Sequence, residues 1–357
     1  MSVFAGPEIS QSGLVFAYDM GNTDKSWKGA PATNLITNPT NEVIATTNEF
    51  NVFADITPIF DTYGTGIYSI SADIKSEVPG DITVYTASGA VEYNIGYYTA
   101  ACESYYKRFY FNNINVTHTD PATTYSNLSF YGTYGTGKRP SIKNVQIEKN
   151  AFCTPFVSGT RSNTQAILDL TRLNTITVNN LTYNSNNIFS FNGSSSWIEL
   201  PTSSLFDSQA ITMESWNNPT ATSQNGFLFE KGQVNTQYSN FYNSDGTFYF
   251  RTMGLSSQDL TFASSSYITA NKWNHVVCTV GNGTKVVYVN GNIVAQATGV
   301  TGTMPTGQTN QYVGKYGSGA NQYTFSGSIA VSKVYNRALT AAEIQQNFNA
   351  LRSRFSI

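Results

Sequence analysis

Short apolar runs in which every second residue is polar recur through the first half of the chain. They lie at residues 67–74, 82–85, 107–111, 128–131 and 142–148. Alternation with period two places one set of side chains on each face of a half-buried strand. Strands at about ten-residue spacing, with no helical period between them, predict an antiparallel β-sandwich over residues 43–157.

A second group of strands follows a small polar segment, SGTRSNTQ, at residues 158–165, which is typical of a junction between domains. The expected strands lie at 188–191, 197–200, 211–216, 227–231 and 247–251. The clearest hairpin runs from Val286 to Val294 and turns at Asn290-Gly291, because this pair readily adopts the positive φ angles of a type I′ turn. These elements predict a second sandwich.

The chain closes with the one helix that the pattern predicts. Thr340 and Glu343 form a T-x-x-E capping box, in which the threonine is the N-cap. Ile344, Phe348 and Leu351 then repeat at spacings of four and three, which gives a single apolar stripe. We expect this stripe to dock on the second sandwich.

Glycine-rich motifs mark the turns between the expected strands. The sequence TYGTG occurs at 62–66 and again at 133–137, and VPGD lies at 78–81. Glycine and proline end regular structure, so these segments predict turns. Neither TYGTG motif is a phosphate-binding loop, because no strand-to-helix transition follows it.

Four motifs follow one another in the C-terminal half. They are Phe189–Ile198 (FSFNGSSSWI), Trp273–Val280 (WNHVVCTV), Tyr288–Gly291 (YVNG) and Phe325–Ala330 (FSGSIA), the last followed by Val334–Thr340 (VYNRALT) and the final helix. In this order they resemble the laminin-G or concanavalin A-like sandwich, in the form common in bacteriophage and environmental proteins. The resemblance covers residues 186 to 354 and implies a lectin-like sandwich there.

The first strand of that family resembles Gly13–Asn22 (GLVFAYDMGN), followed here by Ser26–Gly29 (SWKG). The element that comes next in the family has its counterpart much later, at Asp169–Thr175 and Leu181–Tyr183. The resemblance therefore implies that the opening strand belongs to the C-terminal sandwich. We expect a discontinuous domain of residues 1–32 and 162–357, with residues 33–161 inserted, since insertion is tolerated where the ends of a loop lie close together.

The inserted segment has a resemblance of its own. Asn144–Val157 (NVQIEKNAFCTPFV) is similar to the closing strand of carbohydrate-binding-module-like jelly rolls in phage tail and fibre proteins. Asn34–Pro39 (NLITNP) is similar to the first strand of the same jelly rolls. Both matches imply a second jelly roll that is typical of phage structural proteins.

Composition narrows the functional classes. Charged residues make up 12% and aromatic residues 14% of the 357 residues, and the net charge is -2. A near-neutral chain without a basic run has no field that would attract nucleic acid or an anionic membrane, and no apolar run has transmembrane length. The N-terminus, MSVFAGPEIS, lacks the cationic start and apolar stretch of a signal peptide. We expect assembly in the host cytoplasm and release by lysis inside a virion.

No residue set predicts catalysis. The two histidines, His118 and His275, have no G-x-S-x-G nucleophile elbow and no cysteine cluster beside them in sequence. Glycoside hydrolysis needs two carboxylates across one cleft. Sandwich hydrolases of this resemblance carry them as E-x-D-x-E on one strand, whereas strand 212–217 has only Glu214. Glu199 and Glu230 lie on other strands with no visible partner, so we expect a protein that is not an enzyme.

Two kinds of ligand site remain candidates. Asp19, Asn22 and Asp169 lie in predicted loops that could converge on calcium, which favours oxygen ligands. The alternative is that they only form turns, and no other cofactor is expected. Sugar rings stack on aromatic side chains, and the candidate carbohydrate contacts are Trp27, Tyr93, Tyr97, Tyr98, Tyr238 and Tyr242. The same tyrosines also suit packing or a subunit interface.

We therefore predict an all-β protein of two antiparallel β-sandwiches (jelly rolls), one inserted in the other, with a short C-terminal helix. We expect a non-enzymatic bacteriophage virion structural protein, in a tail fibre, baseplate or neck appendage or as capsid decoration, which acts in assembly and host-surface adhesion. Its partners would be other virion proteins, further copies of the chain and host-surface glycans. The alternative is a carbohydrate-binding receptor-recognition protein, and the third hypothesis is a glycan depolymerase. The virion component, the oligomeric state, the glycan and a Cys102–Cys153 disulfide all stay open.

Overall fold

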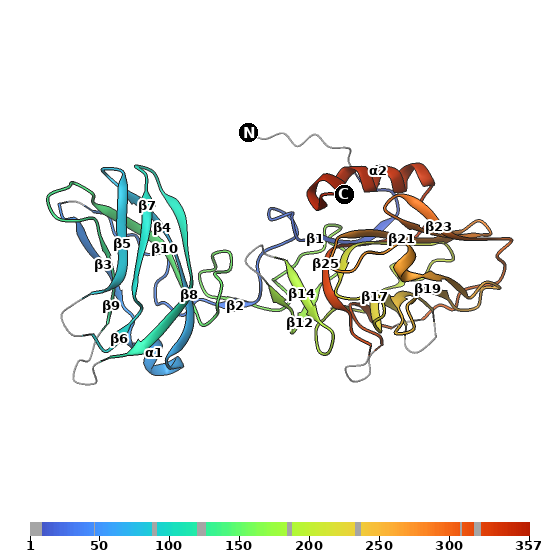
Figure 1. Ribbon diagram of the computed structural model, residues 1–357, viewed down its shortest axis with the longest axis horizontal. Coiled ribbons are helices and arrows are strands. Elements are labelled where there is room, and N and C mark those ends of the chain that lie inside the picture. The colour runs from blue at the N-terminus through green and yellow to red at the C-terminus, as the bar shows by residue number, and fades with distance from the viewer. Residues whose placement is uncertain are drawn as a thin grey trace. The chain divides into compact units, whose positions relative to one another are not determined.

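A computed structural model describes residues 9–45, 47–87, 91–119, 126–183, 188–232, 237–307, 309–317 and 323–357 (Figure 1). The chain folds into two compact units. The split unit comprises Met1–Ala30 and Ser162–Ile357, and the inserted unit comprises Pro31–Arg161. Both units are built from antiparallel sheets, so the predicted all-β class is confirmed. No helix in the described part of the chain is long and apolar enough to cross a membrane.

The split unit has two large sheets. The eight-stranded sheet has the order β13 (Thr182–Tyr183), β14 (Phe189–Asn192), β25 (Ser326–Tyr335), β16 (Ile211–Pro219), β21 (Asn274–Gly281), β22 (Thr284–Val289) and β23 (Asn292–Thr298), and β1 (Leu14–Asp19) also pairs with β25. The seven-stranded sheet has the order β12 (Thr177–Asn179), β15 (Trp197–Leu200), β24 (Gln311–Val313), β17 (Gly226–Lys231), β18 (Tyr238–Tyr242), β19 (Thr247–Thr252) and β20 (Asp259–Ala263). Short 3₁₀ turns lie at η1 (Ser204–Phe206), η2 (Ser264–Ser266) and η3 (Arg352–Phe355).

The core of the split unit combines side chains from both sheets. Phe189 and Val276 of the eight-stranded sheet belong to the same buried cluster as Leu228 and Phe250 of the seven-stranded sheet. Burial of one such side chain contributes about 1.5–3 kcal/mol. Each sheet therefore has an inner face on this core and an outer face turned away from it.

Strand β25 joins the two ends of the split unit. Along one edge it pairs with β16, from Thr212 opposite Tyr335 to Pro219 opposite Gly327. Along its other edge it pairs with β1 and, further on, with β14. The opening strand thus lies in the sheet of the C-terminal sandwich, as the sequence resemblance implies.

Two local predictions for the split unit are confirmed. Asn290 and Gly291, between β22 and β23, have φ angles of 50° and 79°, as a type I′ turn requires. Helix α2 (Ala341–Leu351) starts at the capping box of Thr340 and Glu343. The helix lies against the eight-stranded sheet, where the ring of Phe348 stacks on Trp216 with centroids 5.8 Å apart (Figure 1).

A buried ion pair lies beneath this helix. The Glu214 carboxylate of β16 accepts hydrogen bonds from Lys333 Nζ of β25 at 2.7 Å and from Asn347 Nδ2 of α2 at 2.6 Å. His275 Nε2 lies 3.2 Å from the same carboxylate. Burial alone would raise the pKa of Glu214, but the Lys333 ammonium and the His275 contact outweigh it and lower the pKa to about 2. One carboxylate of β16 therefore connects this strand to β25, to β21 and to the helix.

The inserted unit is a smaller sandwich of two four-stranded sheets. One has the order β10 (Pro140–Glu148), β4 (Gly66–Ser76), β8 (Lys107–His118) and β6 (Tyr93–Asn94), and the other β3 (Phe50–Asp55), β9 (Asn127–Tyr131), β5 (Gly80–Ala87) and β7 (Tyr97–Cys102). Strands β2 (Ala32–Thr33) and β11 (Thr160–Arg161) pair where the chain enters and leaves the unit. Ile70, Ile82, Val84, Phe130 and Ile147 belong to its separate core. Cys102 and Cys153 are free thiols.

One element of the inserted unit differs from the sequence prediction. Helix α1 (Thr57–Tyr63) occupies a stretch that contains the start of the first TYGTG motif, where we expected only a turn. Pro58 lies in the first turn of the helix, where its missing N–H costs nothing, and Ile59 and Phe60 are buried. Packing of these two side chains therefore stabilises a short helix that has no periodic apolar stripe.

We predict that Glu214→Gln lowers the free energy of unfolding of the split unit by roughly 3–5 kcal/mol, because it leaves the Lys333 ammonium buried without its counter-charge. All four tryptophans, Trp27, Trp197, Trp216 and Trp273, lie in the split unit, so tryptophan fluorescence during urea unfolding monitors this unit. The control is Glu214→Gln combined with Lys333→Met, which should recover most of the loss. Equal stability of wild type and Glu214→Gln would show that the ion pair does not hold the helix.

Candidate functional site

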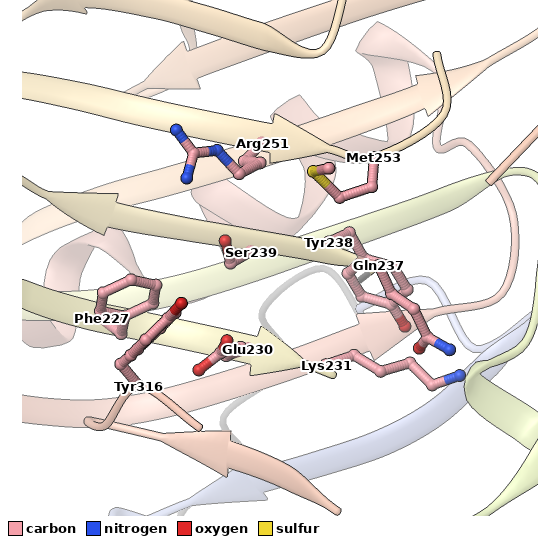
Figure 2. Close-up of a pocket in the computed structure, with 9 residues that line it drawn as sticks. All are labelled: Phe227, Glu230, Lys231, Gln237, Tyr238, Ser239, Arg251, Met253 and Tyr316. Atoms are coloured by element: carbon pink, nitrogen blue, oxygen red, sulfur yellow. The ribbon is translucent and has the colours of Figure 1, made fainter. Parts of the chain in front are cut away.

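A pocket opens on the outer face of the seven-stranded sheet, over β17, β18 and β19 (Figure 2). It measures about 250 Å³, including the part that is open to solvent. Its lining residues are Phe227, Glu230, Lys231, Gln237, Tyr238, Ser239, Arg251, Met253 and Tyr316. Most of this volume is open to solvent, so the pocket is a shallow hollow, and a ligand would lie mainly over the surrounding sheet.

A β-bulge in β17 creates the polar floor of this pocket. The register between β17 and β18 shifts between Phe227 and Phe229. Leu228 and Phe229 consequently both enter the core, while Phe227 and Glu230 lie on the outer face. Strict alternation would have placed Phe227 and Glu230 on opposite faces.

Polar side chains form a row across the outer face. Glu230 lies opposite Ser239, Ser239 opposite Arg251, and Arg251 opposite Asp259 in the strand register. Arg251 Nε and Nη2 donate to the Asp259 carboxylate at 2.8 and 2.9 Å, and these hydrogen bonds raise the pKa of Arg251. The guanidinium is thus held in one orientation at the rim of the pocket.

Glu230 is the buried acid of this row. Burial raises its pKa to about 8, against the opposing effects of the Gly317 N–H, which donates to its carboxylate, and of Lys315. At neutral pH the group is therefore mostly a protonated carboxylic acid, which can both donate and accept a hydrogen bond.

Aromatic rings form a second row beside the polar one. Phe227 stacks on Phe241 with centroids 4.4 Å apart and an interplanar angle of 13°, and Phe241 stacks on Tyr249 at 4.9 Å and 3°. Tyr316 packs against Phe227 at 4.9 Å and against Tyr323 at 5.7 Å. The Arg251 guanidinium lies 5.5 Å from the centre of the Phe241 ring. Phe227 and Phe241 are themselves buried, so Tyr249 and Tyr316 are the partly exposed rings of this row, edged by hydrogen-bonding groups.

Two carboxylates lie on this face, although in the sequence neither has a second carboxylate on its own strand. Glu199 and Glu230 both lie opposite Tyr312 of β24, one on each side. Two strand spacings place their backbones about 10 Å apart. Lys315 lies over the rings of Trp197 and Tyr312, and Glu199 accepts a hydrogen bond from Asn310 Nδ2 at 2.6 Å. Burial lowers the pKa of Lys315, and both carboxylates oppose that change, so Lys315 interacts with both.

Four of the predicted carbohydrate contacts are buried, which corrects their assignment. Trp27 is 1% exposed and packs edge-on against Phe189 at 4.8 Å. Tyr242 is 0% exposed and donates to Asn217 Oδ1. Tyr238 and Tyr93 are also buried, and their hydroxyls donate to the Phe206 carbonyl and to Asp61 Oδ1. The rings of Trp27 and Tyr242 pack within the core of the split unit and that of Tyr93 within the core of the inserted unit, whereas Tyr238 also borders the pocket.

The other two predicted contacts lie next to each other on β7 but face opposite ways. Tyr98 is partly buried and packs towards the core of the inserted unit, with its ring 5.7 Å from Phe111. Tyr97 is exposed on the outer face of its sheet. Neither is part of the pocket on the split unit.

The three predicted calcium ligands all make hydrogen bonds within the protein. Asp169 is buried, and its two carboxylate oxygens accept hydrogen bonds from Ala17, Thr171 and Asn174. Asp19 accepts from the Gly21 N–H and pairs with Arg354, and Asn22 accepts from the Lys25 N–H. Donors of the protein thus occupy both carboxylate oxygens of Asp169 and one side-chain oxygen each of Asp19 and Asn22.

The two histidines lie apart, one in each unit. His275 is buried beside Glu214, and His118 lies 3.5 Å from Glu92 at the surface. Among the residues that the structure describes, no three His, Cys, Asp or Glu side chains are grouped so that they could hold a metal ion.

The split unit is an antiparallel sandwich of two sheets with a pocket on the outer face of one of them. Residues 192–345 match a laminin-G-type family model described as the concanavalin A-like lectin/glucanases superfamily. The split unit therefore has a concanavalin A-like lectin fold, which fits a role in binding. No curated protein matches the sequence.

Solved structures that resemble the chain include binding domains of botulinum neurotoxins. The binding domain of neurotoxin DC in complex with SialylT has 16% identity and a TM-score of 0.42, and the alignment covers 53% of this chain and 50% of that one. The serotype D binding domain has 14% identity and a TM-score of 0.42, with 52% and 50% covered. The aligned part thus spans about half the length of each of these structures.

The raised pKa of Glu230 predicts a pH-dependent stability. Between pH 4.5 and 8 the unfolded chain loses the Glu230 proton while the folded protein keeps it, so stability falls as pH rises through this interval. Glu230→Gln should remove this fall. The variant should then match the wild type near pH 4.5 and exceed it at pH 8 by up to a few kcal/mol, since one pKa unit corresponds to about 1.4 kcal/mol.

Urea unfolding followed by tryptophan fluorescence at pH 5 and pH 8 measures this difference. Glu199→Gln, which removes a carboxylate from the same face, is the matched control. An identical change with pH in wild type and Glu230→Gln would mean that Glu230 is ionised in the folded protein at neutral pH.

Proposed function

We propose that the split unit binds a carbohydrate on the outer face of its seven-stranded sheet, with the pocket at Glu230, Arg251 and Tyr316 as the central subsite. The observation that carries this proposal is the pairing of an aromatic row with a polar row on one hollowed face. The negative face of an aromatic ring attracts the polarised C–H groups of a sugar, and fixed polar groups bind its hydroxyls. The concanavalin A-like lectin fold supports the same role.

We further infer that the protein binds without cleaving its ligand. A retaining hydrolase needs carboxylates about 5–5.5 Å apart, and an inverting one needs room for a water between carboxylates about 6.5–9.5 Å apart. Here Lys315 interacts with both Glu199 and Glu230, and Glu199 is bound to Asn310. A cation therefore lies where a hydrolase would hold its substrate and water.

Glycan-array binding, followed by titration of the strongest ligand, tests this role. Tyr316→Ala should weaken binding at least about tenfold, because it removes a ring from the pocket wall. Tyr267→Ala, which removes an exposed tyrosine of the same unit outside the pocket, should leave affinity unchanged. We expect the glycan to be recovered uncut.

Two results would contradict the proposal. One is equal affinity of the Tyr316→Ala and Tyr267→Ala variants. The other is release of new reducing ends that stops in Glu199→Gln or Glu230→Gln, which would reveal a depolymerase.

We further propose that the protein is a component of a bacteriophage particle, in an appendage or as capsid decoration. There it would act in assembly and host-surface adhesion. The motif order of both units and the low charge support this placement. Immunogold electron microscopy of the particles should label their surface or appendages, and light scattering should show an oligomer held by protein contacts. Label confined to host debris would refute it.

A further inference from the structure

Strand β7 forms a free edge of the sheet β3-β9-β5-β7 in the inserted unit. It pairs with β5 along one side, in a regular register from Gly80 opposite Cys102 to Tyr85 opposite Tyr97. In the part of the chain that the structure describes, no loop or side chain forms a hydrogen bond with the backbone of β7 on its other side. A free edge presents a row of backbone N–H and C=O groups to which another strand can bind.

Other edge strands of the protein have protection that β7 lacks. The N–H and the carbonyl of Ile142 in β10 both form hydrogen bonds with Val43, at 2.8 Å each. The Ala17 carbonyl of β1 accepts a hydrogen bond from the Leu170 N–H at 2.8 Å. Strands β3 and β23 each contain a bulge, where the register shifts. Natural sheets avoid edge-to-edge association through such covers, through bulges and through edge charges, and β7 (YYTAAC) has no bulge and no charge.

The side chains of β7 alternate between the two faces of the sheet. Ala100 and Cys102 belong to the core of the inserted unit, and Tyr98 packs against it. The residues between them point outward and are exposed: Tyr97, Thr99 and Ala101. The Tyr97 ring is supported from one side only, by stacking on Tyr85 with centroids 5.4 Å apart. The outer face of β7 is therefore accessible beside its free edge.

The order of side-chain sizes along β7 is self-complementary. Antiparallel pairing with Thr99 opposite the Thr99 of a second copy brings Tyr97 opposite Ala101. The same register brings Tyr98 opposite Ala100. Residues that lie directly opposite each other share a face of the sheet, with Cβ atoms about 4.5–5.5 Å apart. Each large ring thus meets a small side chain, and no like charges face each other.

We propose that β7 is a self-association edge, through which two copies of the chain pair antiparallel about a twofold axis at Thr99. The sheets of the two copies then join into one continuous sheet, and the interface closes on itself. The size order favours a second copy over an unrelated strand, because an unrelated partner needs no such symmetry. A six-residue pair buries less surface than a standard interface. We therefore expect a weak dimer in solution, which becomes stronger where several copies are held in one assembly.

Sedimentation equilibrium of the full chain in reducing buffer, over a range of concentrations, tests this interface. The wild type should show a reversible monomer–dimer equilibrium. Thr99→Lys and Thr99→Glu should each weaken dimerisation at least about tenfold, because each variant brings two like charges together at the axis. An equimolar mixture of the two variants should recover a heterodimer, since opposite charges then face each other. Val52→Lys, at an exposed residue of the opposite edge strand β3, is the matched control and should dimerise like the wild type.

Three results would overturn the inference. The first is a wild type that is wholly monomeric at about 1 mM protein, where even millimolar association is visible. The second is a dimer that both Thr99 variants form with full affinity. The third is loss of the dimer in both variants without recovery in their mixture, which means that Thr99 does not face its own copy.

The variants should keep the wild-type melting temperature, because Thr99 is exposed, and recovery in the mixture itself requires folded chains. The inference does not depend on the proposed glycan pocket. Tyr316→Ala, which alters the pocket on the split unit, should leave the dimer intact. Failure of the pocket and failure of the β7 edge are therefore measured separately.

Discussion

Strand β25 is the constraint on which the split unit depends, because it must pair with three strands from distant parts of the chain. It binds β16 along one edge, and β1 and β14 share the other. Strand β1 precedes the inserted unit and β14 follows it. Both segments of the split chain must therefore reach one strand near the C-terminus. Lys333 lies on β25 as well, and its bond to Glu214 connects this strand to β16 beneath helix α2.

The outer sheet faces of the two units arise from the same structural rule. In each unit the inner faces of the sheets form a closed core, so the side chains available to a ligand are those on the outer faces. The split unit fills one outer face with an aromatic row and a polar row. The inserted unit instead exposes Tyr97 beside the free edge of β7. The low content of charged residues leaves room for aromatic side chains on both faces.

The sequence predicts the local elements of this fold well, because their signals are short-range. The Asn290-Gly291 turn and the capping box of α2 depend on a few neighbouring residues, and both are confirmed. The strand pattern predicts two sandwiches, and the resemblance of Gly13–Asn22 to a first strand places it in the C-terminal one, where β1 pairs with β25. Helix α1 was not predicted, because its sequence has no periodic apolar stripe. Packing of the buried Ile59 and Phe60 stabilises it instead.

The candidate site could not be predicted from the sequence. It depends on which face of its strand each side chain occupies and on the register between neighbouring strands. Whether a tyrosine in a strand points to the core or to solvent depends on how its sheet packs. From the sequence, Tyr242 and Tyr98 were therefore as good candidates for a sugar contact as Tyr97. Glu230 reaches the pocket only through the bulge in β17, and no sequence signal marks that bulge. Glu199 and Glu230 come together through Tyr312 of β24, which is far from both in the chain.

The crystal structure of the full chain with the strongest ligand of a glycan array tests the central claim most directly. We predict electron density for a sugar ring over β17 to β19, in contact with Tyr316 and within hydrogen-bond distance of Glu230 or Arg251. A glycan bound elsewhere on the split unit, with this pocket filled only by water, would contradict the account.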